Sequence, residues 1–128
     1  MKNKIIVNTH KAPSAVGTYS QGVGVDGIFY FSGQIGISLT TGQLLETFDE
    51  QLAQIMKNID GLLESQDLKR ENIIKTSIFL TDLNNFNKIN EAYLSFFQSP
   101  YPARSTVQVS ALPKGALVEI EVVAARWF

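Results

Sequence analysis

Apolar residues along the chain recur first with the two-residue period of strands and then with the 3.6-residue period of helices. The apolar run 5–7 predicts a short first strand. Two β-prone runs, 22–25 and 28–31, flank Asp26-Gly27, which favours a tight hairpin turn because glycine tolerates positive φ. Run 28–31 is apolar at nearly every position, so we expect both of its faces to be buried.

Two amphipathic helices follow. The first is expected to begin at Thr47 and Glu50, a capping-box pair that satisfies backbone N–H groups at a helix start, and Gly61 weakens the prediction for its last turn. Its apolar stripe comprises Leu52, Ile55, Met56, Ile59, Leu62 and Leu63. The second has Asp82 or Asn84 as its expected cap and a stripe comprising Phe86, Ile89, Tyr93, Leu94 and Phe97. We expect both stripes to pack on the protein's own sheet.

Three later strands are predicted at 73–80, 104–109 and 116–125, the last after a turn at 113–115. The order strands, helix, strand, helix, strands indicates one α+β domain, residues 1–128, with two helices packed on one face of a sheet. Two helices cover only one face, and the other face also holds apolar positions. We therefore expect a second copy of the chain to cover it, with functional sites between subunits.

Composition and charge narrow the chemistry. The 128 residues are 45% hydrophobic and 18% charged, with a net charge of −1 and no cysteine. This excludes disulfides, thiolate nucleophiles and cysteine metal sites, and gives no broad attraction to nucleic acid. The single histidine, His10, cannot form a histidine cluster, so we expect an exposed loop residue and no metal site. The early apolar run is too short for a secretory signal and none is long enough to span a membrane, so we expect a cytoplasmic protein.

The last predicted strand carries the least ordinary pattern. Alternation places Glu119 and Glu121 on one face with Val123 and Ala125, opposite an apolar face. Exposed or ion-paired glutamates are the simpler interpretation of this spacing, and a pair of functional carboxylates is the alternative. Arg104 begins another strand, where its guanidinium either grips a carboxylate through two hydrogen bonds or forms a structural ion pair.

Together these residues fall in segments that resemble signature segments of the RidA (YjgF) family. The resemblance extends along essentially the whole chain, in order, through residues 17–22, 31–35, 90–93, 102–107 and 112–121. It implies a chorismate-mutase-like α+β fold, and a homotrimer with clefts between subunits. It also implies a hydrolase that converts 2-aminoacrylate and 2-iminobutanoate to 2-keto acids and ammonia without a cofactor. Small 2-imino or 2-keto acids are then the expected ligands.

The resemblance also implies roles for individual residues. The carboxylate-binding arginine of the family matches Arg104, and its water-orienting glutamate matches Glu119 rather than Glu121. The remaining matches are Tyr19 and Ser32 as catalytic hydroxyls, Asn90 at the site edge, and backbone groups near Gly33 and Thr106 in the pocket. In such a site Glu119 takes a proton from water and later returns one to the leaving amine.

Two positions depart from the family pattern, and two other functions stay open. Thr18 and Gly36 stand where the family commonly has proline, which we expect to loosen the backbone beside the pocket. A non-catalytic ligand-binding regulator of amino-acid or purine metabolism is the main alternative. RNA cleavage or translation inhibition, also attributed to relatives, has little support from a near-neutral chain with one histidine.

Overall fold

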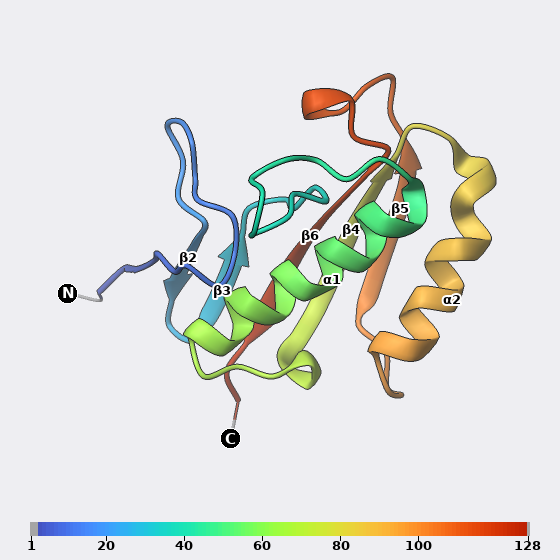
Figure 1. The fold of residues 1–128 in the computed structure, drawn as a ribbon. Coiled ribbons are helices and arrows are strands. Elements are labelled where there is room, and N and C mark those ends of the chain that lie inside the picture. Colours follow the sequence, from blue (N-terminus) through green and yellow to red (C-terminus); the bar gives the residue numbers. More distant parts are fainter. Residues whose placement is uncertain (1–2, 128) are drawn as a thin grey trace.

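The computed structural model of the protein describes residues 3–127, which form one six-stranded mixed sheet and two α-helices (Figure 1). The strands lie in the order β1-β2-β3-β6-β4-β5. Their bounds are β1 Ile5–Val7, β2 Gly22–Val25, β3 Ile28–Phe31, β4 Ile73–Leu80, β5 Ala103–Gln108 and β6 Val118–Ala125. The helices are α1 Phe48–Ser65 and α2 Phe86–Phe96. Only β4 and β5 pair in parallel, and α2 connects them. The predicted α+β architecture is confirmed.

The β2–β3 hairpin forms as predicted, around Asp26 (φ 54°) and Gly27 (φ 80°). Two successive positive φ values are what a two-residue turn between twisted strands requires. The expectation that both faces of β3 are buried is wrong for one chain. Phe29 and Phe31 face the core, whereas Tyr30 is 59% exposed on the opposite face.

The capping box of α1 is confirmed. Thr47 Oγ1 accepts a hydrogen bond from the Glu50 N–H at 3.1 Å, and the Glu50 carboxylate accepts one from the Thr47 N–H at 3.1 Å. The helix continues through Gly61 to its end, because the glycine has a packing role there. A Cβ at Gly61 would lie 2.0 Å from the carbonyl oxygen of Lys11, so the N-terminal segment passes directly across this turn.

The second helix differs from its prediction in three details. Asp82 caps a 3₁₀ turn, Leu83–Asn85, that precedes α2, and its side chain accepts from the N–H of Asn84, the other expected cap. Leu94 is 69% exposed, so it does not belong to the buried stripe. Phe97 is buried but follows the last helical residue. The stripe of α2 is therefore narrower than its apolar pattern suggests.

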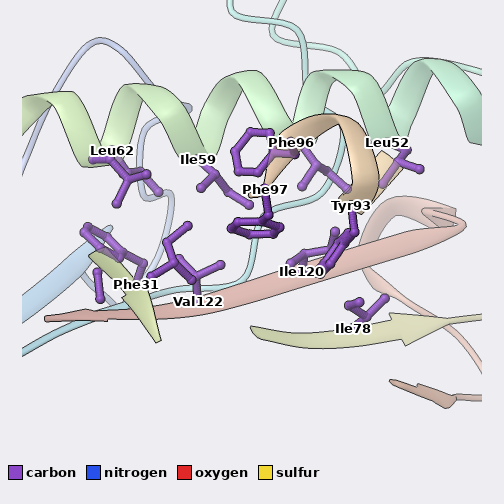
Figure 2. Close-up of a cluster of buried hydrophobic side chains, with 14 of the residues drawn as sticks. Phe31, Leu52, Ile59, Leu62, Ile78, Tyr93, Phe96, Phe97, Ile120 and Val122 are labelled. Carbon is purple, nitrogen blue, oxygen red and sulfur yellow. The ribbon is translucent and has the colours of Figure 1, made fainter. Parts of the chain in front are cut away.

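Both helices lie on the same side of the sheet (Figure 1), and the core fills the space between the helices and the sheet. Figure 2 shows side chains of this core pointing toward one another between helix and sheet. The labelled members are Phe31, Leu52, Ile59, Leu62, Ile78, Tyr93, Phe96, Phe97, Ile120 and Val122. Among the described residues 3–127, no helix covers the opposite face of the sheet, which is called the open face below.

The last strand begins at residue 118, two residues later than predicted. Lys114 (φ 59°) and Gly115 (φ 73°) both adopt left-handed backbone conformations within the 3₁₀ turn Pro113–Gly115, and the N–H of Ala116 still bonds the carbonyl of Pro113. Pairing with β4 therefore begins only at Val118, which lies opposite Leu80. Within residues 3–127, no helix is both long and apolar enough to cross a membrane.

Candidate active site

Glu119 lies near the start of β6 on the open face of the sheet. Its neighbours Val118 and Ile120 are buried in the core, so strand alternation directs Glu119 and Glu121 away from the helices, as predicted. Glu119 is half-buried and Glu121 is exposed. Both line a cavity of about 610 Å³. Its other lining residues are Pro13, Ser14, Val16, Tyr19, Gln21, Ser32, Gly33, Gln34, Ile35, Ile37, Pro113 and Lys114.

The segment after β3 places a glycine against the Glu119 carboxylate. Gln34 and Ile120 exchange two backbone hydrogen bonds, of 2.8 and 3.1 Å, so this segment runs antiparallel beside β6. A Cβ at Gly33 would lie 2.0 Å from Glu119 Oε2. The carboxylate therefore occupies the space that any larger residue at position 33 would fill.

Burial of Glu119 raises the pKa of its carboxyl above the ordinary value, and the negative charge of Glu121 raises it further. Desolvation and a like charge both disfavour the ionised form. A carboxyl with a raised pKa in a cavity can give up and regain a proton closer to neutral pH. This property suits a general acid–base.

Tyr19 and Ser32, the two predicted hydroxyl residues, line the same cavity. Ser32 Oγ donates a 2.6 Å hydrogen bond to the carbonyl of Ser20, so its lone pairs remain available to accept from an N–H of a ligand. Tyr19 is 54% exposed in the loop above. The structure thus brings Glu119, Gly33, Ser32 and Tyr19 together.

The buried Gln21 holds that loop, and sequence reasoning missed this residue. The only local signal is a polar residue directly before a strand. Gln21 Oε1 accepts from the N–H of Thr9 at 2.7 Å. Gln21 Nε2 donates to the carbonyls of Thr9, at 3.0 Å, and of Pro13, at 2.9 Å. Gln21 therefore fixes the loop that supplies one wall of the cavity.

Arg104, by contrast, lies on the helix side of the sheet. Its Nη1 donates a 2.8 Å hydrogen bond to Asn90 Oδ1 on α2. The two residues line a separate cavity of about 350 Å³ whose other walls are Tyr93, Leu94, Tyr101 and Pro102. Arg104 forms no ion pair with a carboxylate among the described residues 3–127. Its guanidinium retains N–H groups for an anionic ligand.

Sheet register shows why the two groups do not meet. Arg104 is opposite Thr76 on β4, and Thr76 is opposite the buried Val122, so all three side chains face the helices. Glu119 is opposite Phe79, three residues farther along β4, and faces the other side. One chain therefore contains two half-sites on opposite faces of the sheet, one carboxylate and one guanidinium.

Thr106, the remaining predicted residue, shares the helix-side face of β5 with Arg104 but does not line the Arg104 cavity. Its Oγ1 is buried and has no hydrogen-bond partner among the described residues. The expected role of the backbone near Thr106 in the pocket stays a prediction. His10 is exposed in the N-terminal loop, as expected.

The two departures from the family pattern behave differently. Thr18 is exposed in the loop near Tyr19. Gly36 is buried, and a Cβ there would lie 2.4 Å from Gln51 Cα, so a side chain at position 36 would require α1 to shift. Gln51 also binds the carbonyl of Leu45 and the N–H of Leu117, at 2.9 and 2.8 Å. This packing opposes the loosening that we expected from Gly36.

Metal chemistry has no obvious ligand set here, because the residues that the structure describes contain no group of three or more histidine, aspartate or glutamate side chains placed to hold a metal ion. The groups available are the Glu119 carboxyl with two nearby hydroxyls at one half-site and the guanidinium of Arg104 at the other.

Comparison with known proteins gives matches over nearly the full chain. The family model described as Endoribonuclease L-PSP matches residues 9–126. A RutC family protein of Aquifex aeolicus is 52% identical over 122 residues, covering 94% of this chain and 98% of that protein. The human protein named 2-iminobutanoate/2-iminopropanoate deaminase is 45% identical over 120 residues, covering 93% and 88%. The crystal structure of E. coli TdcF with bound serine has a TM-score of 0.91 at 40% identity, covering 96% and 99%.

Proposed function

The chain belongs to the endoribonuclease L-PSP family, which includes the RidA (YjgF) proteins, and we propose that it hydrolyses reactive 2-imino acids to 2-keto acids and ammonia. The substrates proposed are 2-iminobutanoate and 2-aminoacrylate, the latter after tautomerisation to its imine. Relatives such as the human protein carry the name of this activity. The observation that carries the proposal is the carboxyl of Glu119, half-buried with a raised pKa in a cavity beside two hydroxyl side chains.

The proposed reaction follows from these groups. Arg104 holds the substrate carboxylate, and Glu119 removes a proton from a water molecule that adds to C2 of the protonated imine. A tetrahedral carbinolamine results. Glu119 returns the proton to the amine nitrogen and is ionised again. The C–N bond then breaks, ammonia leaves, and the C2 hydroxyl gives its proton to the Glu119 carboxylate as the ketone forms. Because an imine carbon is already electrophilic, correct placement of substrate and water supplies much of the acceleration.

Two copies of the chain are needed to assemble such a site. Arg104 and Glu119 lie on opposite faces of the sheet, so we infer that each site takes its guanidinium from one subunit and its carboxylate from a neighbour. The open face also carries exposed apolar side chains that a neighbour would cover: Ile6 (50%), Val25 (39%), Tyr30 (59%) and Val107 (46%). A homotrimer with three equivalent clefts satisfies both requirements.

The ligand of a relative is compatible with this substrate class. TdcF binds serine, a small α-amino acid whose carboxylate and adjacent nitrogen resemble those of a 2-imino acid. In the proposed site the carboxylate meets Arg104, and the lone pairs of Ser32 Oγ accept from the imine N–H. A binding protein without turnover is the second candidate, and it would use Arg104 in the same way. Such a protein has no need of a carboxyl tuned like that of Glu119.

The family description names an endoribonuclease, a function that these cavities support less well. General acid–base cleavage of RNA needs binding of several phosphates, whereas the net charge is −1. The single histidine is exposed outside both cavities. The half-sites fit a small monoanionic ligand.

A trapping assay tests the proposal. A threonine dehydratase generates 2-iminobutanoate in the presence of semicarbazide, which captures the remaining imine as a semicarbazone. The purified protein is expected to lower the rate of semicarbazone formation, and free 2-ketobutanoate should rise by the same amount. Unchanged trapping at enzyme concentrations up to that of the dehydratase, combined with measurable binding of 2-ketobutanoate, would favour the non-catalytic binding protein.

A further inference from the structure

Three side chains on one face of α2 lie against the side chain of Arg104. Phe86, Asn90 and Tyr93 are spaced i, i+4 and i+7, so they lie on one face of the helix. All three contact the guanidinium. Asn90 was predicted from the family resemblance, but Phe86 and Tyr93 were expected only as core residues.

The two aromatic rings contact the guanidinium at cation–π distances. Arg104 Cζ lies 5.1 Å from the ring centroid of Phe86 and 5.4 Å from that of Tyr93. Both values are within the separation of about 6 Å at which a cation is attracted to an aromatic face. With Nη1 bonded to Asn90, three contacts from one rigid helix restrain the orientation of the guanidinium plane.

Tyr93 is itself fixed. Its hydroxyl donates a 2.9 Å hydrogen bond to Thr76 Oγ1, which is fully buried and lies opposite Arg104 in the sheet. Its ring packs edge-on against Phe97 at 5.0 Å. Burial raises the pKa of Tyr93 to about 12, so the hydroxyl stays protonated and keeps donating. Tyr93 thus connects α2, β4 and β5 beneath the arginine.

We propose that Phe86 and Tyr93 are positioning residues of the carboxylate-binding half-site: they hold the guanidinium plane of Arg104 so that the N–H groups not used by Asn90 face the ligand carboxylate. A free arginine side chain loses much rotamer freedom when it binds. The contacts with Phe86 and Tyr93 remove most of that freedom before the ligand binds. This preorganisation improves the affinity for the ligand and the alignment of its carboxylate. The inference rests on the proposed function in so far as the ligand is a 2-imino or 2-keto acid.

Phe86 offers the cleaner test because it is 38% exposed and its replacement disturbs little of the core. We expect Phe86→Leu to weaken binding of 2-ketobutanoate, measured by calorimetry, by about threefold to tenfold. Phe86→Tyr keeps the ring and should keep wild-type affinity. Leu83→Ala, at a 43% exposed position outside both cavities, is the matched control and should change nothing.

Repeating the Phe86 substitution in an Arg104→Lys background separates a positioning role from an effect on general stability. An ammonium group has no plane to orient, so in Arg104→Lys the additional loss from Phe86→Leu should fall to about twofold or less. Tyr93→Phe, which removes only the Thr76 hydrogen bond, should lower kcat more than it raises KM. The Arg104 Nε–H resonance should lie in the ring-current-shifted region in wild type and move in Phe86→Leu.

The outcomes are distinct. Wild-type affinity in Phe86→Leu, or an equal loss in the Arg104 and Arg104→Lys backgrounds, would overturn the positioning role. If the wild type binds 2-ketobutanoate with the expected coupling but hydrolyses no imine, the proposed reaction fails and the positioning role stands. If the wild type binds no 2-keto acid, the ligand class and this inference fail together.

Discussion

Gly33 and Glu119 are packed so closely that position 33 has no room for a side chain: an added Cβ would lie 2.0 Å from the carboxylate Oε2 and 2.9 Å from its Cδ. The obstructing atoms are the end of a flexible side chain rather than backbone. A larger residue at position 33 is therefore expected to move the Glu119 carboxylate and leave the fold intact.

Gly33→Ala should lower kcat/KM for imine hydrolysis by roughly tenfold or more, because a displaced general base no longer reaches the water that it must activate. Melting temperature and oligomeric state should stay close to wild type. Gly42→Asn is the matched control, since Gly42 has open space around it and asparagine tolerates its φ of 73°. Full activity in Gly33→Ala would mean that the position of this carboxylate does not matter.

Glu119 and Glu121 share a face of β6 but are expected to differ in function. Glu119→Gln should reduce imine hydrolysis by roughly 100-fold or more, the usual contribution of a general acid–base, while the oligomer persists. Glu121→Gln should retain most of the turnover. Equal losses in both variants, measured by the semicarbazide assay, would contradict the assignment of Glu119.

The same pair gives a prediction about pH. Hydrolysis needs ionised Glu119, so activity should fall on the acid side as pH drops through its raised pKa, above the range of an ordinary glutamate. Glu121→Gln removes a like charge that raises this pKa. The acid limb of the kcat/KM profile should therefore move to lower pH in Glu121→Gln. A limb that stays in place or moves upward would contradict the electrostatic coupling.

Substitutions at Arg104 should separate the effect of its positive charge on ligand binding from the effect of its planar geometry. Arg104→Lys keeps a positive charge but only a point contact, so we expect partial retention of keto-acid binding with a larger loss of turnover. Arg104→Ala should lose both, since a charge-assisted hydrogen bond contributes about 1.5–3 kcal/mol before orientation is counted. Calorimetry and the trapping assay on the two variants check this. Wild-type hydrolysis by Arg104→Ala would make Arg104 a structural residue.

Gly61 should reverse the usual effect of a helical glycine-to-alanine change. In an exposed helix interior this substitution stabilises by about 0.5–1 kcal/mol. Here the new methyl group would lie 2.0 Å from the backbone carbonyl oxygen of Lys11 and force the N-terminal segment away. We expect Gly61→Ala to unfold at lower urea concentration than wild type, with exposed Lys57→Ala as the control. A gain in stability would show that the contact with Lys11 is dispensable.

Features set by neighbours in sequence could be predicted; features set by distant partners could not. The capping box at Thr47, the Asp26-Gly27 turn and the alternation around Glu119 each depend on a few adjacent residues, and all are present. The side of the sheet that Arg104 faces depends on its register with Thr76, 28 positions earlier in the chain, which no local pattern specifies.

The same distinction explains the errors. Leu94 fits an apolar stripe by spacing, but its exposure depends on where α2 contacts the sheet. Tyr30 lies in an apolar run whose second face has no cover within one chain. Gly61 is expected from sequence to weaken the end of α1, but the structure shows that the backbone of Lys11 packs against it. Phe86 and Tyr93 of α2 contact Arg104 of β5 only because the tertiary fold brings the helix and the strand together.

The proposed site between subunits requires assembly in solution, so sedimentation should first show a trimer at micromolar concentration, with the apolar open face as its interface. The decisive measurement is complementation between two inactive variants, Arg104→Ala and Glu119→Gln, unfolded together and refolded as mixed trimers. Each variant supplies the group that the other lacks. If sites form between neighbours, random 1:1 mixing restores both groups in about a quarter of the clefts, and activity should rise to about a quarter of wild type. If mixed trimers form but stay as inactive as the separate variants, Arg104 and Glu119 do not meet across an interface, and the proposed active site is wrong.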